Sequence, residues 1–152
     1  MQLNVFRTLW GVTTPWQQTV SELQSVGCCG IEARLPLTTE EQRTLARRLE
    51  ASALQYIAIV FSGGGVIPAQ AETPAQHLER LKERFAAAKA LNPRFVNLLA
   101  GNDRWPLAQQ VDFLGRAHEL AAEYELLCSF ETHRATSLYS PWLTLEIIQQ
   151  LP

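Results

Sequence analysis

Residues 126–136 read Leu-Leu-Cys-Ser-Phe-Glu-Thr-His-Arg-Ala-Thr, a stretch typical of a short β-strand that runs into a polar loop. Because successive side chains of a strand point to opposite faces, Ser129, Glu131 and His133 are expected on one face. An unpaired carboxylate costs several kcal/mol in an apolar interior, so Glu131 needs a cation, a metal ion or water. The stretch therefore predicts a candidate site at the carboxyl end of a strand.

The rest of the 152-residue chain alternates predicted strands and helices, which makes five strand–helix units in all. Predicted strands cover residues 3–10, 30–34, 54–61 and 94–100, and the fifth lies within 126–136. Predicted helices cover residues 15–26, 38–51, 73–90 and 106–123, and a last one runs from 140 to the chain end. The alternation predicts a parallel sheet with crossover helices. The chain contains no low-complexity tract or internal linker, so residues 1–152 are expected to form a single domain.

The predicted helix starts carry local signals. Thr38 with Glu41 and Thr73 with Gln76 have the spacing of a capping box. Thr14 is expected to cap the first helix. Four of the five helices are expected to have proline at their first position.

Two architectures fit five such units: an open doubly wound sheet, and a (β/α)8 barrel of which this chain would be the first five units. The chain length favours the open sheet. The strand faces favour the barrel, because central strands of an open sheet are covered on both sides and are expected to be apolar throughout. Here one face of four strands is polar, with Asn4 and Thr8, Glu32 and Arg34, Asn97, and then Ser129, Glu131 and His133. We predict an α/β fold, a parallel barrel of the TIM type that is incomplete, with about five βα units.

Composition narrows the function classes. The formal net charge of -2 provides no basic field for holding nucleic-acid phosphates, so no nucleic-acid partner is expected. No apolar run approaches the roughly 18 residues of a membrane span. The three cysteines, Cys28, Cys29 and Cys128, have no metal-site spacing and are expected to be reduced, which predicts a cytoplasmic protein.

Three segments resemble one known family. The run Phe130-Glu-Thr-His-Arg-Ala-Thr136, followed by Pro141-Trp142, resembles the fifth strand and the following helix of xylose isomerase-like TIM barrels, the sugar phosphate isomerase/epimerase family. Leu9-Trp10-Gly11 resembles the end of that family's first strand, and Gly27-Cys-Cys-Gly-Ile-Glu32 resembles its second-strand pattern. The resemblance covers the whole chain and the N-terminal five of the eight units of the family barrel.

The resemblance implies a metal-dependent isomerase or epimerase of a small sugar or sugar phosphate. In that family a divalent metal, manganese, magnesium, cobalt or zinc, is held by a carboxylate from the fifth strand and by ligands from the sixth to eighth strands. Glu131 matches the first ligand, and the others have no counterpart among these 152 residues. The reaction removes a proton next to a carbonyl group while a cation stabilises the enediolate. We expect the chain alone to be inactive.

Candidate roles follow for the polar residues. His133 and Glu32 are the candidate catalytic residues, and Arg134, Trp10 and Asn97 are the candidate substrate-binding residues. Arg134 would suit a phosphate or carboxylate if it faces the barrel mouth.

Each role has a simpler alternative. Glu131 could form a salt bridge with Arg34 or Arg134, and Glu32 could pair with Arg34. His133 could be solvated, and Asn97 could be satisfied by neighbouring strands.

Other residues are expected to be structural. Trp105 and Trp142 could line a sugar platform with Trp10, but tryptophan in a core or between helices is commoner. Residues 63–65, Gly-Gly-Gly, resemble an anion-binding loop but lack the spacing and the lysine of a P-loop. His77 and His118 lie on predicted helices and are expected at the surface.

Two other function classes remain open. The same barrel superfamily includes metal-dependent hydrolases of the endonuclease IV type, although the acidic balance weighs against DNA binding. A non-catalytic half-barrel is the other class. Its first and fifth strands would be exposed edges, and such edges predict a homo-oligomer.

Overall fold

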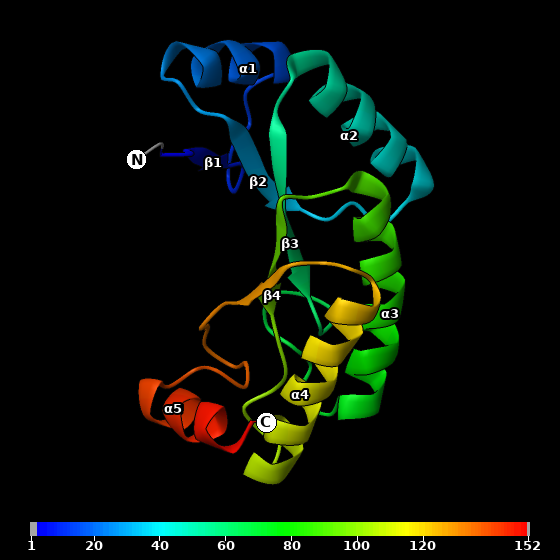
Figure 1. The fold of residues 1–152 in the computed structure, drawn as a ribbon, viewed down its shortest axis with the longest axis vertical. Helices are drawn as coiled ribbons and strands as arrows, with labels where there is room; N and C mark the ends of the chain where they lie inside the picture. The colour runs from blue at the N-terminus through cyan, green and yellow to red at the C-terminus, as the bar shows by residue number, and fades with distance from the viewer. Residues whose placement is uncertain (1–2, 152) are drawn as a thin grey trace.

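The computed structural model describes residues 3–151, which form a parallel five-stranded sheet with helices along its outer face (Figure 1). The strands are β1 (Phe6–Thr8), β2 (Gly30–Arg34), β3 (Gln55–Phe61), β4 (Phe95–Leu99) and β5 (Cys128–Phe130). The helices are α1 (Trp16–Ser25), α2 (Thr39–Ser52), α3 (Pro74–Leu91), α4 (Leu107–Glu123) and α5 (Pro141–Gln150). The five predicted strand–helix units are therefore present in the predicted order.

The strand order distinguishes the two architectures. Each strand pairs in parallel with the next one along the chain, in the order β1-β2-β3-β4-β5. A doubly wound sheet reverses its strand order at a switch point, whereas a barrel adds its strands consecutively. The fold is thus an incomplete parallel barrel of about five βα units, as predicted, and β1 and β5 are the two edges of its open sheet.

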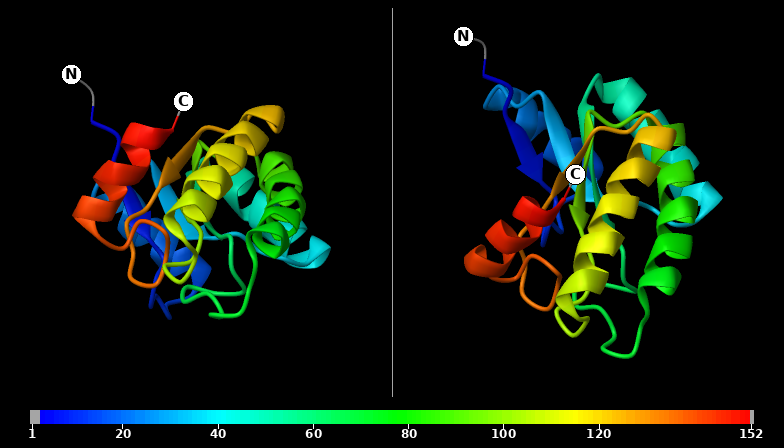
Figure 2. Two further views of the ribbon diagram at one scale, coloured as in Figure 1. Left: turned by 90° about the horizontal axis from the view of Figure 1, so that it is seen from below. Right: turned by 60° about the horizontal axis from the view of Figure 1, so that its bottom comes forward.

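The outer face of the sheet forms the core with the helices. Ile31, Ala58 and Leu98 are fully buried there, and so are Phe85 of α3 and Phe113 of α4. Helices α2, α3 and α4 follow one another along this face, while no helix within residues 3–151 covers the opposite face of the sheet (Figure 1). Figure 2 shows α5 beside α4 and past the end of β5, where Ile147 is buried.

Helix starts differ partly from the predictions. The capping boxes of Thr38 with Glu41 and of Thr73 with Gln76 are both formed. The prediction that Thr14 caps α1 is wrong, because Pro15 is the N-cap residue and the Thr14 hydroxyl lies 2.9 Å from the Thr19 hydroxyl instead. Pro74 and Pro141 begin their helices, whereas Pro15 and Pro106 precede theirs by one residue.

The edge strands are shorter than predicted. β1 covers three residues where a strand over 3–10 was expected, and β5 also covers three. An edge strand has a pairing partner on one side only, so its ends gain less from continuing the ladder. Over residues 3–151, no helix combines the length and the apolar character that crossing a membrane requires.

Candidate functional site

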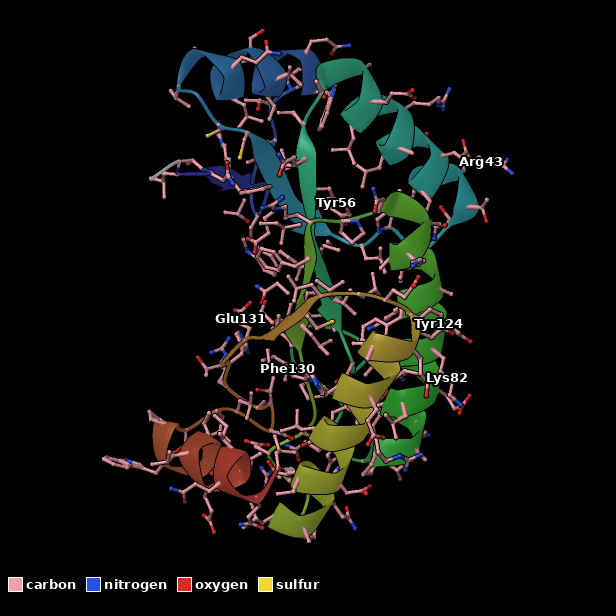
Figure 3. The ribbon with its side chains drawn as sticks, in the orientation of Figure 1. Arg43, Tyr56, Lys82, Tyr124, Phe130 and Glu131 are labelled. Carbon is pink, nitrogen blue, oxygen red and sulfur yellow. The ribbon has the colours of Figure 1, made fainter. Side chains whose placement is uncertain are left out.

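Strand register brings the polar face together at the carboxyl ends of the strands. Thr8 pairs with Glu32, and Asn97 of β4 pairs with Ser129 of β5. Glu131 follows β5 directly, and its amide donates to the Leu98 carbonyl at 3.0 Å. Figure 3 shows Glu131 on the open side of the sheet, away from α3 and α4. The predicted polar face is therefore the inner, barrel-lumen face.

Asn97 joins the two candidate carboxylates. Its Nδ2 donates to Glu131 Oε2 at 2.7 Å and to Glu32 Oε1 at 3.3 Å. Its Oδ1 accepts a hydrogen bond from the Ser129 hydroxyl at 3.2 Å, which orients the amide nitrogen towards the carboxylates. Carboxylates from β2 and the end of β5, 99 positions apart in the sequence (131 − 32), thus share one donor. The expectation that neighbouring strands satisfy Asn97 is consistent with these bonds.

A cavity of about 360 Å³ opens beside these carboxylates at the mouth of the half-barrel. It is lined by Thr8, Trp10, Glu32, Ile59, Phe61, Val66, Leu99, Glu131 and His133. Its walls therefore combine two carboxylates and an imidazole with aromatic and aliphatic side chains. Mostly apolar walls with a few converging polar groups are typical of small-molecule sites.

Arg34 does not neutralise either carboxylate. Its guanidinium carbon lies 4.2 Å from the centroid of the Trp10 ring and 5.4 Å from that of Phe61. Over residues 3–151, Arg34 forms no ion pair with Glu32 or Glu131. The predicted Glu32–Arg34 pair is wrong, because the aromatic rings hold the guanidinium by cation–π contact instead.

His133 and Arg134 separate at the end of β5. His133 lines the mouth cavity, and its Nδ1 lies 2.8 Å from the Arg134 carbonyl oxygen. Because a carbonyl oxygen only accepts, Nδ1 is the donor in this contact, which leaves Nε2 available to a ligand. The exposed Arg134 side chain lines a second groove, against α5, with Tyr139, and His133 borders this groove as well as the mouth cavity. Arg134 is thus outside the set of residues that lines the mouth cavity.

The tryptophans have three different positions. Trp10 is 54% exposed and lines the mouth cavity. Trp105 is buried, and its Nε1 donates to the Glu72 carbonyl oxygen at 2.8 Å. Trp142 is exposed on α5. Only Trp10 of the three lies where it could contact a ligand of the mouth cavity.

Sequence reasoning missed a buried network behind the mouth. His77 was expected at the surface but is fully buried, so that expectation is wrong; His118 is exposed, as expected. His77 Nδ1 lies 2.9 Å from the Ser62 hydroxyl, and Nε2 lies 3.1 Å from Glu72 Oε2. Burial lowers the pKa of His77 to about 4, against the opposing effect of Glu72.

The hydrogen-bond donors of this network determine which of its atoms carry protons. The Gly101 amide donates to the Ser62 hydroxyl oxygen at 2.8 Å, so the hydroxyl proton of Ser62 is free to donate to His77 Nδ1. The neutral His77 ring then donates from Nε2 to Glu72. Arg80 adds bonds to the Ser62 carbonyl and to Glu72 Oε1. The network ties the loop after β3 to the end of β4. The signal that could have predicted it is the spacing of His77, Leu81 and Ala88, which share one face of α3.

Comparison with known proteins supports the fold. No protein-family model matches the chain, and no curated protein is significantly similar to it. Among solved structures, a xylose isomerase domain protein from Planctomyces limnophilus aligns with 99% of this chain and 59% of its own, with a TM-score of 0.65 and 18% identity.

Two epimerases align similarly. An L-ribulose 3-epimerase matches with a TM-score of 0.70 and 16% identity, over 97% of this chain and 57% of that one. The D-allulose 3-epimerase of a Methylomonas species, solved in complex with D-allulose, matches with a TM-score of 0.69 and 15% identity, over 97% of this chain and 58% of that one. This chain thus spans less than two thirds of the length of the structures it matches. Its fold comprises five βα units of the parallel barrel found in xylose isomerase-like sugar isomerases and epimerases.

Proposed function

We propose that this chain is the N-terminal part of a cytoplasmic, metal-dependent isomerase or epimerase of small sugars or sugar phosphates. The enzyme acts by proton transfer next to a carbonyl group. The observation that carries the proposal is the pair of carboxylates, Glu32 and Glu131, held by one amide at the edge of the mouth cavity. The likeness in fold to an epimerase solved with D-allulose supports a sugar as the ligand class.

The polar and aromatic residues in and around the mouth have separate roles in this proposal. Glu32 accepts the carbon-bound proton, because its carboxylate lines the cavity and Asn97 holds it in place. His133 hydrogen-bonds a substrate oxygen through Nε2 once Nδ1 is engaged by the Arg134 carbonyl. The Trp10 ring packs against an apolar face of the sugar. Asn97 contacts a sugar hydroxyl, and Arg134 binds an anionic substituent only where the substrate reaches the groove beside α5.

The mouth fits only part of a divalent-metal site. Glu131 would hold the metal, and the cation, when bound, supplies stabilisation of the negative charge that develops on the substrate oxygen. Within the described range 3–151, no group of three or more His, Cys, Asp or Glu side chains is arranged to bind a metal. A cation held mainly by one carboxylate keeps several waters and binds weakly. Further ligands would have to come from outside these residues, so the chain alone is expected to bind metal weakly and to be inactive.

The proposal is tested by Mn²⁺ titration of the ¹⁵N-labelled chain, with paramagnetic broadening of the NMR signals as the readout. We expect broadening at the Asn97 side-chain amide and around Glu131, at millimolar Mn²⁺. Glu131→Gln should remove this broadening because it removes the charged ligand. Glu119→Gln, at an exposed position on α4, is the matched control and should leave it unchanged. Broadening that is unaffected by Glu131→Gln, or that maps to another face, would show that Glu131 is not a metal ligand.

A further inference from the structure

Arg34 and Arg84 line one cavity beside the glycine run after β3. Arg84 of α3 is 9% exposed, and its Nη1 donates to the Gly63 carbonyl at 2.7 Å. Burial lowers the pKa of Arg84, as expected for a cation removed from water. In the part of the chain that the structure describes, neither Arg84 nor Arg34 forms an ion pair with a carboxylate. A buried cation without a carboxylate in contact is costly, so a bound anion would stabilise it.

These arginines line a small cavity, here called the arginine pocket. Its volume is about 140 Å³, and its walls are Arg34, Arg84, Gly64 and Gly65 with the apolar residues Leu35, Leu37, Ile59, Val60 and Phe61. The backbone amides of Gly64 and Gly65 donate no hydrogen bond to any residue between 3 and 151. Arg34, Arg84, Gly64 and Gly65 thus border one cavity, and guanidinium groups and unpaired backbone amides are groups that bind anions in proteins.

The neighbouring acidic group is already neutralised. Glu72 Oε1 lies 4.0 Å from the position that a Cβ on Gly64 would occupy. The same oxygen accepts a hydrogen bond from Arg80 at 2.6 Å, and Oε2 lies within hydrogen-bond distance of His77. Glu72 and Glu83 attract Arg84 only at longer range, and over residues 3–151 no carboxylate is in direct contact with Arg34 or Arg84.

We propose that the arginine pocket binds a phosphoryl dianion. Two guanidinium groups balance its two charges, and their planar forks match phosphate oxygens, whereas a carboxylate would leave one cation unpaired. At about 30 Å³ per water, the cavity holds the equivalent of about five waters, which is enough for a phosphoryl group. The glycine run, which lacks the features of a P-loop, acts here through its free amides and through the absence of side chains.

The arginine pocket adjoins the mouth cavity, so its anion could be a free ion or part of a ligand that also occupies the mouth. The two cavities share Ile59 and Phe61, and Arg34 lies over Trp10 of the mouth. The phosphoryl group is either free phosphate or the end of a sugar phosphate whose carbon chain enters the mouth. Only the second source rests on the proposed function; the site itself does not require it.

Binding of inorganic phosphate, measured by calorimetry at low salt and neutral pH, tests the site. We expect saturable binding that weakens about tenfold or more in Arg34→Gln, since one charge-assisted contact is lost. Gly64→Asp should weaken it at least as much, because a Cβ fits there but the added carboxylate repels the anion. Arg43→Gln, at an exposed position on α2, is the matched control and should bind as the unchanged chain does. Absence of saturable binding to the unchanged chain, or equal weakening in Arg43→Gln, would overturn the proposal.

Two further ligands separate the sources. If fructose 6-phosphate binds more tightly than both phosphate and fructose, the pocket binds the phosphoryl group of a phosphorylated substrate. If phosphate binds as tightly as fructose 6-phosphate, the pocket binds the free ion. Either result supports the site. Glu131→Gln should leave phosphate affinity unchanged, so failure of the metal proposal and failure of this one are distinguishable.

Discussion

Acidification below pH 6.5 should destabilise the folded chain through His77. The imidazole is fully buried, with the Ser62 hydroxyl at Nδ1, Glu72 at Nε2 and the ring of Trp105 at 4.8 Å. Burial disfavours the charged ring most strongly; Glu72 opposes this effect, whereas Arg80 and Arg84 reinforce it. The folded state therefore holds His77 neutral to lower pH than the unfolded chain does.

The magnitude follows from proton linkage. The pKa of His77 falls from its ordinary value of 6.5 to about 4 on folding. Above pH 6.5 the ring is neutral in both states, and the stability is fully present. Between pH 6.5 and about 4 only the unfolded chain binds the proton, so the free energy of unfolding falls by about 1.4 kcal/mol per pH unit. The total loss is about 3 kcal/mol, a large share of the 5–15 kcal/mol that is typical of a domain.

Urea denaturation at a series of pH values measures this slope. Carboxylates with a lowered pKa, such as Glu72, lose their contribution only below their ordinary value of 4.5, so the interval from 6.5 to 4.5 isolates His77. His77→Gln should lack the slope in that interval, whatever its absolute stability. His118→Gln, which changes an exposed histidine on α4, should keep it. An NMR titration in which the His77 ring of the folded chain titrates near pH 6.5 would refute the reasoning.

Two further predictions concern packing and the sheet edges. Gly101→Ala should cost about 2–4 kcal/mol in the free energy of unfolding, because Gly101 has a left-handed φ of +77 degrees and the new Cβ would meet the Ser137 side chain. Gly65→Ala, with open space around it, should cost less than about 1 kcal/mol in the same urea experiment. Equal losses in the two variants would contradict this assignment. The edge strands β1 and β5 each pair on one side only, so the chain should self-associate through them in light scattering, and a clean monomer of 17.1 kDa would count against edge pairing.

Local pattern predicted much of the fold and part of the site. The alternation along 126–136 placed Glu131 and His133 on the lumen face, and both line the mouth cavity. The capping box of Thr38 with Glu41 was predicted from its spacing and is formed. These features succeed because strand alternation and helix capping depend on residues within a few positions of one another.

Two expectations failed where the deciding partner is distant in the sequence. Glu32 and Arg34 share a strand face, but the Trp10 ring, on another strand's end, holds the guanidinium. His77 was placed on a surface because it is polar and helical, but the residues that bury it include Trp105 and Phe113. Polarity alone predicts exposure only when no distant group satisfies the side chain.

The sequence by itself determined the five strand–helix units, their order and the polarity of each strand face, because periodicity of 2 or 3.6 residues is a local property. Only the tertiary structure decided which groups meet. Parallel register placed Asn97 between Glu32 and Glu131, and helix packing placed Arg84 against the glycine run near Arg34. Such contacts depend on register and on crossover geometry, which bring together residues that are far apart in the chain and that no local pattern specifies.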